Sequence, residues 1–166
     1  GAVRCRSAWP QSRAKGEMGD EEGLPGNEYA VTFQVVDDAT LMAAIKARES
    51  ACAPLLKPMG GDPLKALALS LQDPPYATKS ESVKVASCEL VCRVLALIKE
   101  ADMDNALASL SLEDCDVLMK YVYRAVGIAG KEQTFYTAML KWHPAVLRRA
   151  GPASILRTVA EVHRPL

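Results

Sequence analysis

The sequence is poor in aromatic residues, carries no excess of charge of either sign, and contains no long hydrophobic run. Aromatic residues make up only 5% of the 166 residues, which favours helices because aromatic side chains are among the strongest strand formers. Lysine plus arginine number 20, as do aspartate plus glutamate, so the zero net charge argues against nucleic acid or an anionic membrane as the main partner. Charged residues interrupt every apolar run before the roughly 18 residues that a membrane-spanning helix needs. With 49% hydrophobic residues, the chain still has enough apolar content to build a core.

The sequence also lacks the short motifs that mark common catalytic and metal sites. No HExxH, CxxC, P-loop or GxGxxG sequence is present. The five cysteines are odd in number and irregularly spaced, which is typical of reduced intracellular thiols rather than of a disulfide framework. Cys88 and Cys92 share one helical face, and without a second ligand pair they are better explained as buried thiols than as zinc ligands. We therefore expect no metal and no cofactor, and we leave open a thiol enzyme that uses Cys88, or Cys115 with His143.

Residues 1–37 differ in character from the rest of the chain. Residues 1–15 contain four bases and no acid, whereas residues 17–38 contain seven acids and no base. Two interpretations of residues 1–17 stay open: a transit peptide or, as we prefer, non-native residues upstream of a natural start at Met18. We expect residues 1–37 to form a flexible acidic tail, disordered or extended, because charge and glycine leave little to bury. Within this tail, the β-branched and aromatic segment Tyr29–Val36 is expected to bind a partner in extended form, through Tyr29 and Phe33.

Residues 38–166 show the apolar spacing that predicts an all-α domain. Asp38, Asp62 and Asp102 are expected at helix N-caps, and Ser111 with Asp114 forms a capping-box pattern. No repeat at a fixed period is visible, so a simple repeat solenoid is not indicated. Six or seven short helices are predicted, over about residues 39–51, 64–72, 80–101, 103–109, 112–126, 132–150 and 152–162, with the sixth broken or kinked by Pro144 and carrying a buried Trp142.

Two of these helices are apolar over most of their surface. Helix 81–100 has a single polar strip, which predicts a central helix wrapped by its neighbours. In helix 112–126, one apolar face comprises Val117, Leu118, Tyr121, Val122 and Ala125, and a second comprises Met119, Tyr123 and Val126. A small domain has little room to bury both faces, so we expect one of them to be a protein-binding surface, with Met119 and Tyr123 as its best candidates. The alternative for these two residues is that both faces are internal, since apolar helix faces more often belong to the core.

The C-terminal part of the chain is basic. Residues 124–166 contain seven bases and two acids. No aromatic residues alternate with these bases as they do in single-strand binding proteins. We therefore interpret the segment as a solvated surface, or as one that faces an acidic partner, rather than as a nucleic-acid site.

Four segments in the second half of the chain occur in the order and at the spacing of one known family. They are Asp73–Ser80 (Asp-Pro-Pro-Tyr-Ala-Thr-Lys-Ser), Asp116–Arg124 (Asp-Val-Leu-Met-Lys-Tyr-Val-Tyr-Arg), Leu140–His143 (Leu-Lys-Trp-His) and Gly151–Arg157 (Gly-Pro-Ala-Ser-Ile-Leu-Arg). The similarity around these segments covers about Asp62 to Arg157. On these motifs the chain resembles the 16-kDa subunit (subunit 5) of the actin-related protein 2/3 complex.

The resemblance implies an α-α superhelix that is not an enzyme and that serves as a structural subunit of a complex nucleating branched actin filaments. It implies partners within that complex: the 20-kDa subunit and the WD-repeat subunit for the helical domain, and an actin-related subunit for the tail. We accordingly expect a cytoplasmic protein of the actin cytoskeleton that binds neither nucleic acid nor membrane. The expected partner-binding residues are Met119, Lys120, Tyr123 and Arg124, besides Tyr29 and Phe33. A free-standing helical adaptor with other protein partners is the alternative.

Overall fold

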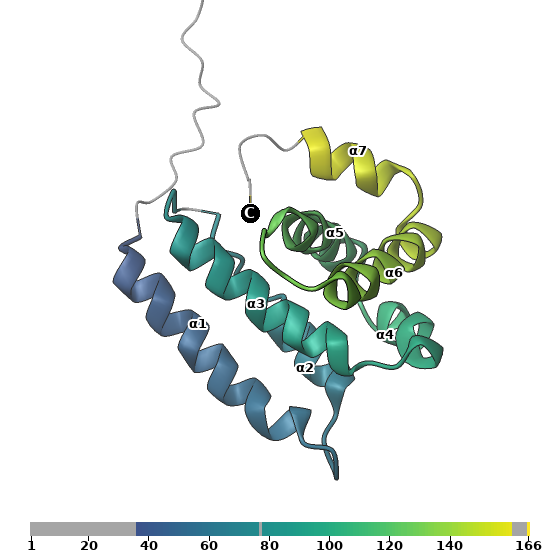
Figure 1. The fold of residues 1–166 in the computed structure, drawn as a ribbon, viewed down its shortest axis with the longest axis horizontal. Coiled ribbons are helices and arrows are strands. Elements are labelled where there is room, and N and C mark those ends of the chain that lie inside the picture. Colours follow the sequence, from purple (N-terminus) through teal and green to yellow (C-terminus); the bar gives the residue numbers. More distant parts are fainter. Residues whose placement is uncertain (1–35, 77, 161–165) are drawn as a thin grey trace, which may run out of the picture. The chain divides into compact units, whose positions relative to one another are not determined.

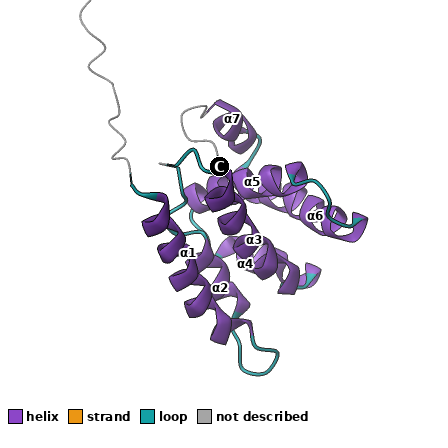
Figure 2. Ribbon diagram, turned by 60° about the vertical axis from the view of Figure 1, so that its left-hand side comes forward, coloured by secondary structure: helices purple, strands orange, loops and turns teal. Residues whose placement is uncertain are grey.

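The computed structural model describes residues 36–76, 78–160 and 166, and all of these fall within the unit formed by residues 33–166. The described residues contain helices and no strand, as Figure 2 shows, which confirms the predicted all-α class. Their seven α-helices are α1 (Asp38–Cys52), α2 (Pro63–Ser70), α3 (Glu81–Leu97), α4 (Met103–Ala108), α5 (Leu112–Gly127), α6 (Gln133–Ala150) and α7 (Ala153–Ala160), with two 3₁₀ helices, η1 (Ala53–Leu56) and η2 (Glu100–Asp102).

Most of the expected N-terminal tail lies outside the described residues. This applies to residues 1–35, and therefore to Tyr29, Phe33 and the proposed start at Met18. The boundary between tail and helical domain at residues 37 and 38 stays a prediction, although α1 begins at Asp38.

Local capping signals place three helix starts correctly and one incorrectly. The Asp62 carboxylate accepts a hydrogen bond from the Lys65 backbone N–H, and the resulting stabilisation of the anion lowers the pKa of Asp62. Ser111 and Asp114 form the predicted reciprocal capping box at the start of α5. Asp102 is the N-cap residue of α4, as predicted, although its side chain makes no capping hydrogen bond. The prediction for Asp38 was wrong, because Asp38 is inside α1 and its carboxylate instead accepts a hydrogen bond from the Thr78 hydroxyl, at 2.5 Å.

Two helices differ from their predicted extents. Helix α3 ends at Leu97, four residues before the predicted end near 101, because Ile98 adopts an extended conformation and enters the core. Helix α6 runs without a break from Gln133 to Ala150 even though it contains Pro144, so of the two predicted effects of this proline, a break or a kink, the break was wrong. An internal proline costs about 3 kcal/mol. Packing explains how this cost is offset, because Trp142 before the proline and Val146 after it are both buried on one face of α6.

The helices stack as a superhelix. Helix α1 packs against α3, α3 against α5, and α5 against α7, while α4 packs against α6. Figure 1 shows α1 and α3 side by side along their lengths, with α2 lying against both. Helices α1, α3, α4 and α5 therefore each contact the next helix but one, which is the packing of an α-solenoid and agrees with the fold implied by the resemblance.

Polar contacts between helices recur at a nearly constant distance along the sequence. Five ion pairs join residues 81–116 to residues 124–157 at separations of 41 to 44 residues: Glu81–Arg124, Glu89–Lys131, Glu100–Lys141, Asp104–Arg148 and Asp116–Arg157. Glu49 and Arg93, which join α1 to α3, are also 44 residues apart. The structure thus has a period that sequence similarity between segments does not reveal. We call the five pairs the inter-helix ion pairs, although Lys131 lies in the connection between α5 and α6.

Helix α3 is the centre of the domain, as its apolar composition predicted. It packs against α1, α2, α5 and α6. Trp142 on α6 is 1% exposed, which confirms its predicted burial, and Tyr121 on α5 is equally enclosed. The buried Tyr121 hydroxyl lies 2.8 Å from the Ser87 hydroxyl of α3, so the polar end of this ring is satisfied inside the core.

Candidate interaction surface

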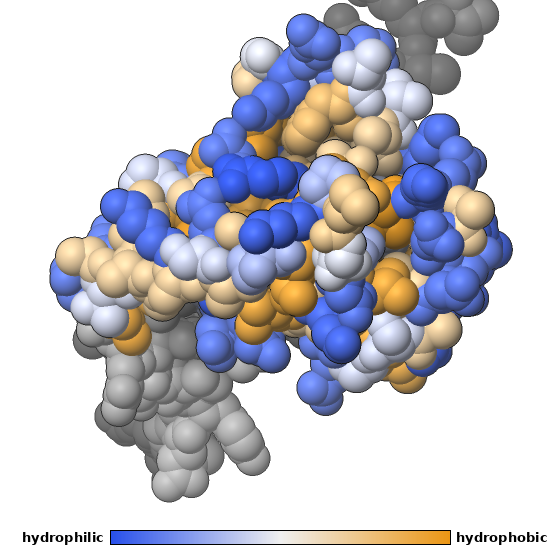
Figure 3. Space-filling model, turned by 90° about the horizontal axis from the view of Figure 1, so that it is seen from below, coloured by the Kyte–Doolittle hydropathy of each residue, from blue (hydrophilic) through white to orange (hydrophobic). Residues whose placement is uncertain are grey.

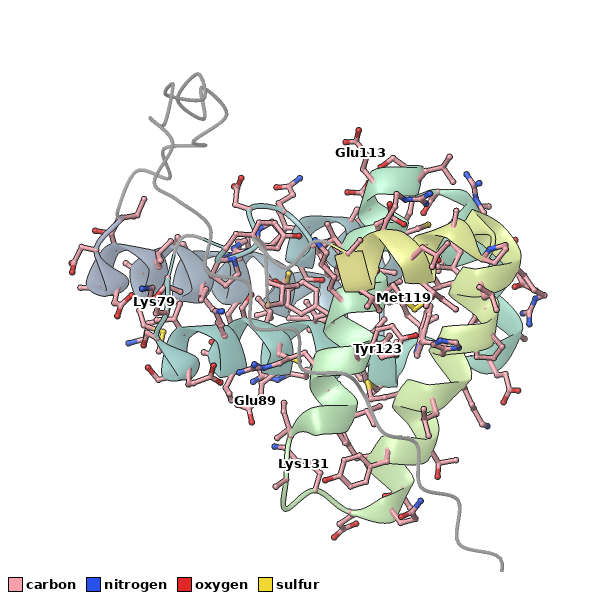
Figure 4. All side chains as sticks on the ribbon, turned by 90° about the horizontal axis from the view of Figure 1, so that it is seen from above. Lys79, Glu89, Glu113, Met119, Tyr123 and Lys131 are labelled. Atoms are coloured by element: carbon pink, nitrogen blue, oxygen red, sulfur yellow. The ribbon has the colours of Figure 1, made fainter. Side chains whose placement is uncertain are left out.

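Helix α5 buries more of its surface than its sequence suggested. The first apolar face is enclosed by α3 and α6 as predicted, with Leu118, Tyr121, Val122 and Ala125 at most 1% exposed. The second face is only partly open: Met119 is 0% exposed, whereas Tyr123 and Val126 are 41% and 38% exposed. Figure 4 shows Met119 where α7 crosses α5. The expectation that Met119 is exposed to a partner was therefore wrong, because α7 packs over this part of α5.

Tyr123 forms the exposed part of the second face together with a histidine from α6. Its hydroxyl lies 3.1 Å from His143 Nε2, and the two rings meet edge to face with centroids 5.5 Å apart. This pair fixes the Tyr123 ring across the α5–α6 interface while leaving part of it exposed. A rigid aromatic ring with a polar end is a common element of protein interfaces.

Lys120 and Arg124 lie beside Tyr123 on α5 but use their charges within the chain. The Lys120 ammonium lies 4.7 Å from the centre of the Tyr76 ring, and Lys120 is only 8% exposed. The Arg124 guanidinium pairs with Glu81 and also donates to the Leu166 carbonyl, at 3.2 Å. Partner binding by Lys120, Tyr123 and Arg124 stays a prediction, in which Tyr123 is the most exposed of the three.

The basic segment near the C-terminus does not form a separate basic surface in the described residues. Its bases at 124, 131, 141, 148 and 157 are the basic members of the inter-helix ion pairs, and Arg149 donates to the Leu110 carbonyl. The acidic partner of this segment is therefore the chain's own region 81–116. On the face shown in Figure 3, hydrophilic side chains separate smaller hydrophobic areas, so charged and apolar surface are mixed.

Two cavities flank Ile98 at the end of α3. One, of about 430 Å³, is bounded by Met103, Ala138 and Trp142, with the Lys141–Glu100 ion pair among its lining residues. The other, of about 410 Å³, lies between Leu64 on α2 and the residues around Ile98. Both are of the size of small-ligand sites, but neither contains a cluster of groups that would commit it to one ligand chemistry.

The described cysteines occupy the core. Cys52, Cys88, Cys92 and Cys115 are free thiols and at most 5% exposed, whereas Cys5 lies outside the described residues. Burial raises the pKa of Cys115 and of Cys52, which disfavours the reactive thiolate. Among the described residues, no group of three or more histidine, cysteine or acidic side chains is placed to hold a metal ion. None of the described helices combines the length and the apolar composition that membrane crossing requires.

The surface that sequence reasoning missed is the outer side of α7. Leu156 and Val159 are 71% and 67% exposed, whereas Ser154 is buried. The signal was present in the sequence: Ser154 and Thr158 share one side of a helix, and Leu156 and Val159 lie away from that side. Helix α7 thus places its hydroxyl-bearing side inward together with Ile155, and exposes Leu156 and Val159.

Comparison with known proteins identifies the family of the chain. Residues 23–164 match the family described as "ARP2/3 complex 16 kDa subunit (p16-Arc)". The chain belongs to this family. The match extends beyond the Asp62–Arg157 region of the motifs and includes Tyr29 and Phe33.

Individual members of the p16-Arc family show moderate identity to the chain. "Actin-related protein 2/3 complex subunit 5" of Dictyostelium discoideum is 33% identical over 124 residues, which are 75% of this chain and 86% of that protein. "Actin-related protein 2/3 complex subunit 5-C" of Xenopus laevis is 35% identical over 60% of this chain and 65% of its own length. The human "Actin-related protein 2/3 complex subunit 5-like protein" is 32% identical over 60% of this chain and 63% of its own length.

Proposed function

We propose that this protein is a non-catalytic structural subunit of an actin-related protein 2/3 complex and contributes to the nucleation of branched actin filaments. The observation that carries the proposal is the family match over residues 23–164. The structure supports it because most of the charged groups near α5 are used to hold helices together, as expected of a scaffold. Cys88 and Cys115, the two cysteines of the thiol-enzyme alternative, are both 0% exposed, and burial raises the pKa of Cys115, which argues against Cys115 as a nucleophile.

The partners that fit this role are other subunits of the complex. We assign the 20-kDa subunit and the WD-repeat subunit to the helical domain, and an actin-related subunit to the segment Tyr29–Val36. Tyr123, with its ring oriented by His143, is the partner-contacting residue of α5 that the geometry favours. Such a subunit would work in the cytoplasm, on the actin cytoskeleton.

Affinity purification of the tagged chain from a native lysate, followed by mass spectrometry, tests the proposal. We expect the remaining subunits of the complex to co-purify in equal proportion with the chain. A chain that co-purifies with other proteins and without these subunits would instead be a free-standing helical adaptor. The functional test is actin polymerisation: a complex assembled without the chain should nucleate fewer branches, and adding the chain back should restore them.

A further inference from the structure

Helix α7 ends the described superhelix with an apolar surface. At 3.6 residues per turn, Ala153, Leu156 and Ala160 form one stripe, with Val159 beside it, and all four side chains are exposed. The charged residue of α7, Arg157, reaches back to Asp116 on α5. The four outward residues themselves are uncharged, with the partly exposed Arg157 at their edge, and the large Leu156 side chain lies between two alanines that permit close approach of another helix.

The inward side of α7 is the less apolar one. Ser154 and Thr158 point toward α5, and among the described atoms their hydroxyl oxygens have no hydrogen-bond partner. Ile155 is the aliphatic residue of α7 that packs against the core. An unpaired buried hydroxyl opposes folding. Packing on α5 therefore stabilises α7 less than it would stabilise a helix with an aliphatic inner side.

The order of the superhelix indicates what kind of element belongs on this surface. Helices α1, α3 and α5 are each covered by the next helix but one, and α7 is the last described member of that series. Figure 1 shows α7 at the edge of the described helices. Solenoid ends normally carry polar outer surfaces because an apolar end exposes the packing surface for a further repeat.

We propose that the outward side of α7, formed by Ala153, Leu156, Val159 and Ala160, is a docking surface for an apolar helix of a neighbouring subunit, which continues the superhelix. This inference rests on the proposed function and names the surface that the function uses. The surface carries no charge, so the partner helix presents an aliphatic stripe with three- and four-residue spacing. The superhelix is then shared between two chains.

The size of the surface argues against a second copy of this chain as the occupant. Helix α7 has eight residues and is about 12 Å long and about 10 Å wide, a footprint far below the roughly 800 Å² per partner of a standard interface. Two free chains held only through α7 would dissociate. A helix of a neighbouring subunit is held in the complex by other contacts as well, so the small surface of α7 is sufficient for it.

The test compares Leu156→Glu with Met59→Glu in a complex co-expressed with the other subunits. Both residues are exposed, at 71% and 91%, but Met59 lies in the connection between η1 and α2. We expect Leu156→Glu to lower incorporation at least about tenfold, because it places a charge in an apolar contact, and Met59→Glu to incorporate normally. Circular dichroism of both free variants should match the wild type, since neither position is buried.

Hydroxyl-radical footprinting of the wild-type chain gives a second measurement. Modification of Leu156 and Val159 should fall several-fold on assembly, while that of Met59 stays constant. Normal incorporation of Leu156→Glu, or unchanged footprinting of Leu156, would overturn the inference and leave the proposed function intact. Failure of the wild-type chain to incorporate would overturn the proposed function itself. A free wild-type dimer that Leu156→Glu abolishes would make a second copy the occupant, and would also overturn the inference.

Discussion

Arg157 of α7 binds both carboxylate oxygens of Asp116 on α5. Its Nε lies 2.5 Å from Oδ2 and its Nη2 lies 2.9 Å from Oδ1. Such two-point contacts fix the orientation of both side chains, unlike a single contact between charges. Because Ile155 is the aliphatic residue with which α7 meets the core, this pair is a principal determinant of how α7 sits on α5.

Asp116→Asn should loosen α7 without unfolding the domain. The Asp116 side chain is only 18% exposed, but Arg157 is 43% exposed, so the loss should be at most about 1 kcal/mol. We expect hydrogen exchange of the α7 amides to accelerate roughly two- to fivefold while the melting temperature changes little. Asp104→Asn, which removes the exposed partner of Arg148, is the control and should leave the exchange of α7 unchanged. Equal exchange in wild type and Asp116→Asn would show that the pair does not hold α7.

Trp142→Ala should be strongly destabilising. The ring is 1% exposed within α6 and borders the open cavity of about 430 Å³ beside Ile98, so its removal leaves a void in the core. Large-to-small changes of this kind cost about 3–5 kcal/mol, which urea denaturation can measure. Leu140→Ala, on the same helix but 51% exposed, should cost far less. Similar midpoints for the two variants would contradict the central role of Trp142.

Met119→Glu and Tyr123→Glu should separate core from surface on α5. Met119 is fully buried, so its replacement by a carboxylate without a partner should cost more than about 3 kcal/mol and lower the helical content seen by circular dichroism. Tyr123 is 41% exposed, and Tyr123→Glu should stay folded. If the free Tyr123→Glu variant folds but fails to enter the complex, Tyr123 is a contact residue. Normal assembly of this variant would remove it from the interface.

The buried Tyr121 hydroxyl predicts a loss of stability at high pH. Burial is the main cause that raises the pKa of Tyr121 from 10 to about 12. The unfolded chain therefore releases this proton at lower pH than the folded chain, so stability falls between pH 10 and 12. At about 1.4 kcal/mol per pKa unit, this contribution is roughly 2–3 kcal/mol.

Tyr121→Phe isolates this contribution from other groups that titrate in the same range. The variant should be less stable at neutral pH, because the Ser87 hydroxyl loses its partner at 2.8 Å. Its stability should then decline less steeply than that of the wild type above pH 10. Parallel stability curves for the two proteins, measured by denaturant titration at each pH, would show that Tyr121 titrates normally.

The thiols of the described residues should be inert in the native protein. A Cys5→Ser background removes the cysteine outside the described residues, and the other four are buried. We expect Ellman's reagent to label this variant slowly in buffer and completely in guanidinium chloride. Rapid native labelling of Cys115 would revive the thiol-enzyme alternative, despite the raised pKa that burial gives it.

Features set by neighbouring residues were predictable from the sequence, and features set by distant residues were not. The capping box of Ser111 and Asp114 requires only a three-residue spacing, and the apolar surface of α3 is visible in its own composition. Pro144 remained inside a helix because buried neighbours on both sides hold α6 in place, and that packing has no local signature. Met119 is covered by a helix that begins 34 residues later, so its burial depended on the position of α7.

The same limit applies to charge. The excess of bases after residue 124 suggested a solvated surface or an acidic partner. The acids of region 81–116 are too far away in the sequence for a local pattern to indicate that they neutralise these bases. Their pairing follows from the superhelix, which brings residues 41 to 44 positions apart into contact. Analysing the sequence one helix at a time does not detect contacts between residues so far apart.

The constant separation of the inter-helix ion pairs also bears on how the chain folds as it leaves the ribosome. Each basic member follows its acidic partner by 41 to 44 residues, so it is synthesised roughly 2–9 s later at ordinary elongation rates. No contact in this series has to wait for a distant C-terminal segment. The domain can therefore grow one helix at a time from its N-terminal end, with α7 the last described helix to join.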